Sequence, residues 1–66
     1  MDLLGKKIKI IYQNWKGIVG VREIHPIKIW YGSTPFHEEE QWFINAMDDD
    51  KKEMRDFAIK DIIKWL

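Results

Sequence analysis

Apolar and polar residues alternate along much of the chain, and this period of two is typical of strands with one buried face. Residues 7–12 carry isoleucine or tyrosine at every second position, which predicts a first strand. The sequence Asn-Trp-Lys-Gly at 14–17 has turn chemistry, and the β-branched stretch at 18–24 predicts the returning strand of a hairpin. Proline has no N–H to donate to a ladder, so Pro26 indicates a strand entry or a bend, after which 27–31 alternate and predict a third strand.

The second half of the chain predicts another hairpin after a long connection. Residues 32–40 combine Gly, Ser, Thr, Pro and three consecutive Glu, which predicts the longest exposed loop of the chain. Residues 41–47 form an aromatic and apolar run, and 54–59 resume the alternation. The polar residues 48–52 between them predict the turn that joins the two strands.

The end of the chain changes its period. Ile59, Ile62 and Ile63 have helical spacing, which predicts a short terminal helix or helical turn that caps one end of the sheet. Five short antiparallel strands in so few residues favour a closed or nearly closed barrel, because closure removes exposed strand edges. In so small a mainly β domain the large side chains are needed inside, so Trp42 and Phe57 are expected in the core.

Composition shows what must stabilise this domain. The length of 66 residues is enough for one unit, so residues 1–66 are expected to form a single domain. The chain has no Cys, and its two His stand apart from any thiolate, so neither a disulfide nor a structural zinc site is expected. A hydrophobic content of 45%, with four Trp, must therefore stabilise the fold through one core.

Charge limits the classes of partner. Eleven basic and eleven acidic side chains cancel, which argues against the broad cationic field of a nonspecific DNA coat protein. A site for a polyanion must then be a local patch. No apolar run approaches the roughly 20 residues that span a bilayer, and residues 1–9 lack the apolar stretch of a signal peptide. We expect a cytoplasmic protein without a membrane partner.

Neither metal binding nor catalysis has a convincing pattern. The acidic runs at 38–40 and 48–50 contain carboxylates, but they lack the Gly and the distal Glu of a calcium loop and the paired His of a helical zinc motif. Ser33 and Thr34 lie near His37 in one loop, without an orienting third group or a Gly-rich phosphate cradle. We therefore predict a non-catalytic protein with no metal or cofactor.

Trp15 is the aromatic residue that stands apart from the predicted core. It lies in a turn between Asn14 and Lys16, where an exposed indole beside a cation is a contact point for a nucleic-acid base or for a partner protein. Base stacking on an open aromatic ring contributes about 1 to 3 kcal/mol per base.

Several segments occur in an order that points to a known family. Tyr12 is followed by Arg22 and Pro26, then by Gln-Trp-Phe-Ile-Asn-Ala at 41–46 and by Arg-Asp-Phe at 55–57. Over nearly the whole chain this order and spacing resemble the WYL domain family. The Trp-Phe-Ile run matches the Trp-Tyr-Leu run that names the family, and the Arg-x-Phe segment follows after a turn as it does there.

The resemblance implies an SH3-like or Sm-like form of the five-stranded barrel, found in bacterial and phage regulators that sense nucleic acids or nucleotide-like ligands. Two positions depart from the family pattern. Phe43 stands where Tyr is common, which removes a phenolic hydroxyl, and residues 60–62 read Lys-Asp-Ile where Asp-Arg-Ile is frequent. Members usually carry a DNA-binding helix-turn-helix, for which this chain has no room, so it is expected to act alone, as an oligomer or through a partner.

The candidate ligand residues are basic. Arg55 and Arg22 match the family pattern, and a guanidinium can hold a phosphate with two parallel hydrogen bonds. The alternative for each arginine is a structural ion pair, for Arg55 with Glu53 or Asp56. Lys28 is the neighbouring basic residue expected to support the same ligand.

Two functions from different classes follow. The first is a regulatory module that binds single-stranded nucleic acid or a nucleotide-type ligand through Arg55, Arg22, Trp15 and Lys28. The second is a protein interaction or self-assembly domain, which the neutral net charge favours, with a homo-oligomer or another protein as partner.

Overall fold

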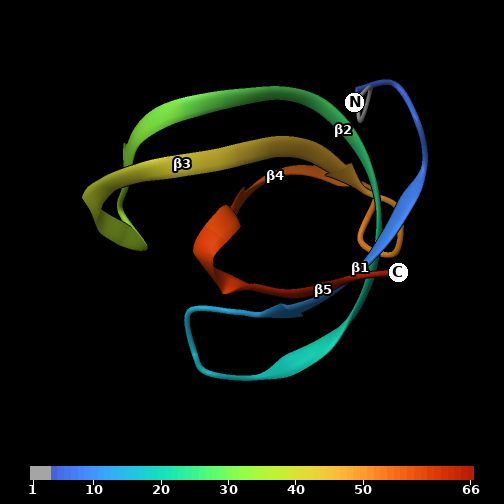
Figure 1. Ribbon diagram of the computed structural model, residues 1–66, viewed down its shortest axis with the longest axis horizontal. Helices are drawn as coiled ribbons and strands as arrows, with labels where there is room; N and C mark the ends of the chain where they lie inside the picture. Colours follow the sequence, from blue (N-terminus) through green and yellow to red (C-terminus); the bar gives the residue numbers. More distant parts are fainter. Residues whose placement is uncertain (1–3) are drawn as a thin grey trace.

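Antiparallel strands make up most of the computed structural model, which describes residues 4–66. The elements in chain order are β1 (Ile8–Gln13), β2 (Val19–Thr34), β3 (His37–Asp48), β4 (Glu53–Ala58), the 3-10 turn η1 (Ile59–Asp61) and β5 (Ile62–Trp65). They form one curved sheet in the order β4-β3-β2-β1-β5 (Figure 1). The predicted mainly β class with five antiparallel strands is confirmed, although two of the strands differ from those predicted.

One long strand replaces two of the predicted ones. β2 continues through Pro26 instead of ending before it, so its first part pairs with β1 and its later part with β3. The register with β3 shifts between Pro26 and Lys28, which is a bulge with Ile27 as the extra residue. A bulge bends a strand and accommodates a residue that cannot donate to the ladder. Pro26 therefore marks the bend, as expected, but the separate strand at 27–31 was wrong.

The long loop predicted at 32–40 was also wrong. β2 extends to Thr34 and β3 begins at His37, so only Pro35 and Phe36 connect them. The Thr34 side-chain oxygen accepts the His37 backbone N–H at 3.1 Å and closes the turn. The three Glu lie exposed on β3, where solvent-facing strand positions tolerate charge.

The predicted helical turn near the C-terminus is confirmed only for Ile59–Asp61. Ile62–Trp65 forms β5, which pairs with the free edge of β1. The backbone N–H of Leu66 adds a bond to the carbonyl of Lys9 at 2.9 Å. The spacing of the isoleucines predicted a helix for these residues, but pairing with an open edge satisfies their backbone groups better than a short isolated helix does.

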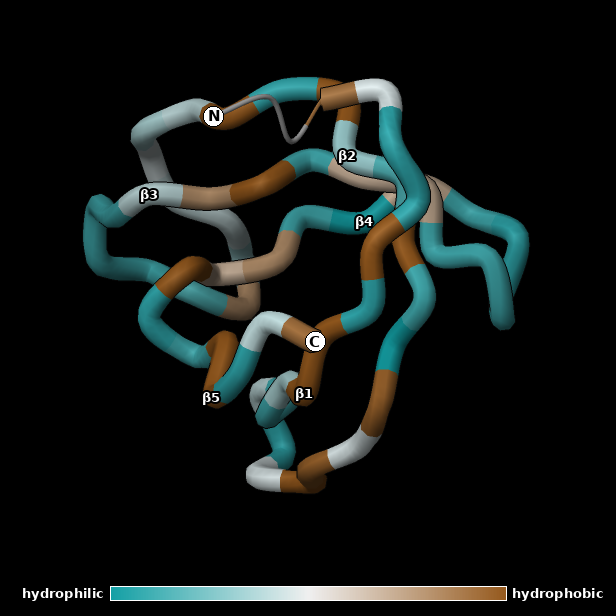
Figure 2. Tube along the Cα trace, turned by 45° about the vertical axis from the view of Figure 1, so that its right-hand side comes forward, coloured by the Kyte–Doolittle hydropathy of each residue, from teal (hydrophilic) through white to brown (hydrophobic). Residues whose placement is uncertain are grey.

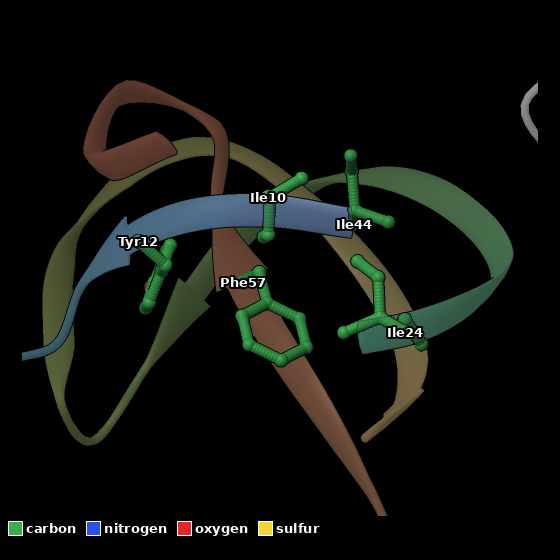
Figure 3. Packing of buried hydrophobic residues seen from close by; sticks show 6 residues of the cluster. Ile10, Tyr12, Ile24, Ile44 and Phe57 are labelled. Carbon is green, nitrogen blue, oxygen red and sulfur yellow. The ribbon is translucent and has the colours of Figure 1, made fainter. Parts of the chain in front are cut away.

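The core lies on the inner side of the curved sheet. Figure 3 shows its side chains converging from four strands, β1 to β4. Tyr12 meets Phe57 edge to face, with ring centroids 5.0 Å apart. The Tyr12 hydroxyl accepts the backbone N–H of Ala58 at 3.0 Å, which ties β1 to the end of β4. Phe57 is buried as predicted. The buried members of the cluster are Ile10, Tyr12, Ile24, Ile44, Ala46 and Phe57.

Trp42 was predicted to lie in the core, and this was wrong, because 55% of it is exposed. β1 pairs with the first part of β2 only, so it does not cover the distal end of the β2–β3 hairpin, where Trp42 lies opposite Tyr31. The neighbouring Phe43 is fully buried instead. Its ring stacks on Trp30 with centroids 4.9 Å apart. β3 is therefore buried on both faces at its centre.

The sheet has two free edges. Within residues 4–66 no register joins β4 to β5, so the sheet is open and the predicted closure into a barrel is not confirmed. Hydrophobic segments are spread along the trace in Figure 2, and many large apolar side chains are exposed. In the described part of the chain, no helix has the length and apolar character needed to cross a membrane.

Candidate functional site

A pocket of about 260 Å³ lies between the β1–β2 loop, the β2–β3 turn and β4. It brings together three of the four residues predicted to bind ligand, Trp15, Arg22 and Arg55. These residues are far apart in the sequence, and the curvature of β2 brings their elements to one side of the sheet (Figure 1).

Arg22 is held by a buried carboxylate. Its Nη1 lies 3.5 Å from Oδ2 of Asp48, and the Asp48 side chain is completely buried while that of Arg22 is 19% exposed. The other oxygen of Asp48 accepts the backbone N–H groups of Asp50 and Lys51 at 3.0 and 3.2 Å. Asp48 thus organises the β3–β4 turn and needs Arg22 as its counter-ion, because a buried charge without a partner is costly.

Arg55 has a weaker and more exposed partner. Its Nη1 donates a hydrogen bond to Oε1 of Glu53 at 3.1 Å, and both side chains are substantially open to solvent. Exposed ion pairs typically contribute about 0 to 1 kcal/mol. The guanidinium of Arg55 can therefore exchange Glu53 for a ligand at small cost, whereas that of Arg22 cannot leave Asp48 so easily.

The loop that carries Trp15 is internally fixed. The side-chain oxygen of Asn14 accepts the backbone N–H groups of Lys16 and Ile18, both at 2.9 Å. Gly17 has a φ of 83°, a left-handed conformation that favours glycine. Trp15 is 55% exposed at the tip of this loop, as its position in the sequence predicted. The backbone that carries the indole is thus fixed, which lowers the entropy that the loop loses when a ligand binds.

Phe36 is a pocket residue that sequence reasoning missed. It projects from the β2–β3 turn, and its ring lies 5.4 Å from that of Trp15 at an interplanar angle of 31°. The two exposed rings form one wall of the pocket. The available signal was a single aromatic residue directly after Pro35 in an otherwise polar segment.

Lys28 does not line this pocket. It is exposed on β2 and lies opposite Asn45, which in turn lies opposite Asp56. Asp56 Oδ1 accepts hydrogen bonds from the Trp30 indole at 2.9 Å and from the Asn45 amide at 3.0 Å. The structure therefore separates Lys28 from the other three predicted ligand residues.

The floor of the pocket is aromatic and uncharged. Tyr12 and Phe57 line it from the core. Burial raises the pKa of the Tyr12 phenol, because it disfavours the phenolate, so Tyr12 is neutral at physiological pH. The arginines are offset by Glu53 and Asp56 at the rim. This arrangement suits a flat ligand with a localised negative charge better than an extended polyanion.

A second charged group joins the segment before β1 to β2 and to the β3–β4 turn. Lys7 binds Glu23 at 2.8 Å and lies 3.9 Å from Asp49, which also contacts His25 at 2.9 Å. The hydrogen bond between Lys7 and Glu23 raises the pKa of the lysine and lowers that of the glutamate. No group of three or more potential metal-ligating side chains occurs within residues 4–66. These contacts form a solvent-exposed ion-pair network.

Comparisons of the chain with protein-family models, with curated proteins and with solved structures find no match.

Proposed function

We propose that this chain is a non-catalytic regulatory module that binds a nucleotide-type ligand or a single-stranded nucleic acid in the pocket between Trp15, Arg22 and Arg55. The observation that carries the proposal is the convergence of an exposed aromatic wall and two guanidinium groups in one cavity. A base offers a flat ring for the wall, and a phosphate offers the charge for an arginine.

Arg55 is the residue that contacts the phosphate. It is partly exposed, and its present partner Glu53 holds it only through an exposed ion pair. Arg22 contributes positive charge to the pocket while it remains paired with Asp48. Arginine presents two parallel N–H groups to a phosphate, a geometry that lysine cannot reproduce.

The base stacks on Trp15 and Phe36. Their rings come from two different connections, so a bound base also bridges the β1–β2 loop and the β2–β3 turn. A cavity of about 260 Å³ lies just below the usual range of ligand pockets, roughly 300 to 1,000 Å³, which favours one nucleotide or one nucleotide of a strand over several.

The first experiment measures the melting temperature of the protein with AMP, GMP, CMP, UMP and a short oligothymidylate. A ligand that binds only the native state must raise the melting temperature. We expect Arg55→Lys to leave folding nearly unchanged and weaken binding, and Arg55→Ala to weaken it further and lower the salt slope by about one unit.

Lys28→Ala is the matched control, since it removes an exposed cation outside the pocket. It is expected to leave affinity for the strongest ligand unchanged. The proposal fails if none of these compounds changes the melting temperature, or if Arg55→Ala and Lys28→Ala have equal effects on binding.

The fold assignment and cellular setting belong to the same proposal. We assign the sheet to the SH3-like and Sm-like barrels in an open form, supported by its strand order and by the bend in β2. The resemblance to WYL domains supports a regulatory role in the cytoplasm of bacteria or in phage-infected cells.

A second candidate function is protein interaction. The observation that favours it is the large amount of exposed apolar surface, including side chains on β2, β3 and β5. Contiguous apolar patches on small soluble proteins commonly mark contact sites.

A further inference from the structure

The distal end of the β2–β3 hairpin carries an exposed aromatic and apolar surface that the ligand pocket does not use. Tyr31 lies opposite Trp42, and Ile29 lies opposite the core residue Ile44 in the same register. Because residues paired across strands project to the same face, the three side chains Ile29, Tyr31 and Trp42 extend the core face of the sheet beyond the core. We call these three residues the hairpin face.

The two rings of the hairpin face form an open corner. Their centroids are 5.2 Å apart and their planes meet at 66°. Tyr31 and Trp42 are 54% and 55% exposed, so their outer surfaces are available to a partner. The Tyr31 hydroxyl reaches the carbonyl of Glu40 at 3.5 Å, which places an acidic residue beside the corner.

Negative charge is concentrated in the part of β3 that leads to Trp42. Glu38, Glu39 and Glu40 precede Trp42 on β3, and all three are exposed. Within residues 4–66 none of their carboxylates takes part in an ion pair. An unpaired negative run beside electron-rich ring faces attracts cations and repels phosphates.

We propose that the hairpin face, with Glu38, Glu39 and Glu40, binds a basic segment of a partner protein, in which arginine or lysine alternates with apolar residues. The cationic side chain lies against the Tyr31 and Trp42 rings and near the glutamates, and the neighbouring apolar side chain covers Ile29. This inference goes beyond the pocket and deepens the second candidate function, because it names the chemistry of the protein partner.

The charges at this surface favour a basic peptide segment over two other partners, a nucleic acid and a second copy of the chain. Exposed aromatic rings also stack on nucleic-acid bases, but the three glutamates oppose a phosphate backbone at this surface. A second copy of the chain would bring its own Glu38, Glu39 and Glu40 to a symmetric contact through the same face, and like charges would then meet.

The test uses the intact protein and a fluorescent nonapeptide of alternating Arg and Leu. Anisotropy measures binding, and the indole N–H signals of the four Trp report its location in an NMR spectrum. We expect the peptide to shift the Trp42 signal and to leave that of Trp15 unchanged. Raising the salt concentration should weaken binding, because the glutamates supply part of the attraction.

Three variants separate ring, charge and background effects. Trp42→Leu keeps an apolar side chain but removes the ring, and should weaken binding about fivefold to tenfold. Replacement of Glu38, Glu39 and Glu40 by Gln should weaken it to a similar extent, about fivefold or more. Trp15→Leu is the matched control and should have no effect on the peptide.

Several results would overturn this proposal. Equal binding of a peptide with Gln in place of Arg would show that the rings take any apolar strand. A Trp42 signal that shifts with protein concentration alone would assign the surface to a second copy, and one that shifts with oligothymidylate would assign it to nucleic acid. A nucleotide that shifts only the Trp15 signal leaves the pocket proposal standing even if the peptide fails to bind.

Discussion

Arg22 and Arg55 line the same pocket, yet their partners give them different roles. Asp48, the partner of Arg22, is fully buried, whereas Glu53, the partner of Arg55, is largely exposed. Desolvation makes a buried carboxylate depend on its counter-ion, while solvent replaces the partner of an exposed one. The sequence pattern presented both arginines as ligand candidates, because it does not show the burial of a carboxylate 26 positions away from Arg22.

We expect Arg22→Ala to lower the free energy of unfolding by about 2 to 4 kcal/mol, slightly less than for a fully buried pair because Arg22 is partly exposed. Arg55→Ala should lower it by less than about 1 kcal/mol. Urea denaturation of the two variants measures both changes under the same conditions.

The control is a double variant that also neutralises the carboxylate. Asp48→Asn keeps an oxygen that can accept the N–H groups of Asp50 and Lys51, so Arg22→Ala with Asp48→Asn should recover part of the stability that Arg22→Ala loses. If the double variant is no more stable than the single one, the cost comes from packing around Arg22 and not from an unpaired charge.

The candidate site could be predicted from the sequence in part. Trp15 was identified because a Trp between Asn14 and Lys16 in a turn has no obvious place in a core. Phe36 was missed because the residues around it were expected to form a long loop, so its position beside Trp15 had no reason to be considered. Lys28 was included because it is basic, but only the register of β2 shows that it lies away from the pocket.

At the scale of single elements, β3 shows why a large aromatic side chain is not placed in the core by its size alone. Trp42 and Phe43 are adjacent and face opposite sides of the strand, and only Phe43 is buried. The alternation of side chains along a strand shows which residues share a face of the sheet. It does not show which parts of that face are covered by another element. The Trp30 and His37 rings cover Phe43, at centroid distances of 4.9 and 5.7 Å, whereas β1 does not extend over Trp42.

The adjacent residues Trp42 and Phe43 provide a matched test of stability. Phe43→Ala should destabilise the domain by about 3 to 5 kcal/mol, the usual cost of removing a buried large aromatic side chain. Trp42→Ala loses only the exposed cross-strand contact with Tyr31 and should cost about 1 kcal/mol or less. Chemical denaturation followed by circular dichroism measures both.

If Phe43→Ala does not fold, Phe43→Leu provides a milder comparison with the same ordering. A larger loss for Trp42→Ala than for the Phe43 variants would mean that the hairpin face is packed in the native protein, and it would also remove the surface proposed for a basic segment.

At the scale of the whole molecule, a fold of five antiparallel strands could be predicted from the sequence, but the residues that belong to each strand could not. Two predicted strands are parts of β2, because a bulge lets the chain bend at Pro26 without ending its pairing. The fifth strand is β5, whose residues show helical spacing but find an open edge on β1. Short-range patterns describe local preference, whereas pairing partners far away in the sequence decide which backbone groups can be satisfied.

The resulting sheet predicts an uneven distribution of local stability. β2 is paired on both sides, while β5 is a four-residue edge strand held by β1 alone. Of its side chains, Ile62 packs against the core, and Ile63 and Trp65 are exposed. Little apolar burial is lost when β5 detaches, so it can open without unfolding the rest of the sheet.

Native-state hydrogen exchange followed by NMR tests this distribution. The paired amides of β5 should exchange with an opening free energy at least about 1 kcal/mol below that of the central β2 and β3 amides, which should approach the global value. The Ala58 N–H provides the internal comparison, because it is bonded to the buried Tyr12 hydroxyl close to where β5 begins. It should be protected like the core while Lys64 and Trp65 are not. Equal protection of β5 and β2 would show that the molecule opens only as a unit, which would require contacts across the free edges beyond those that pair β5 with β1.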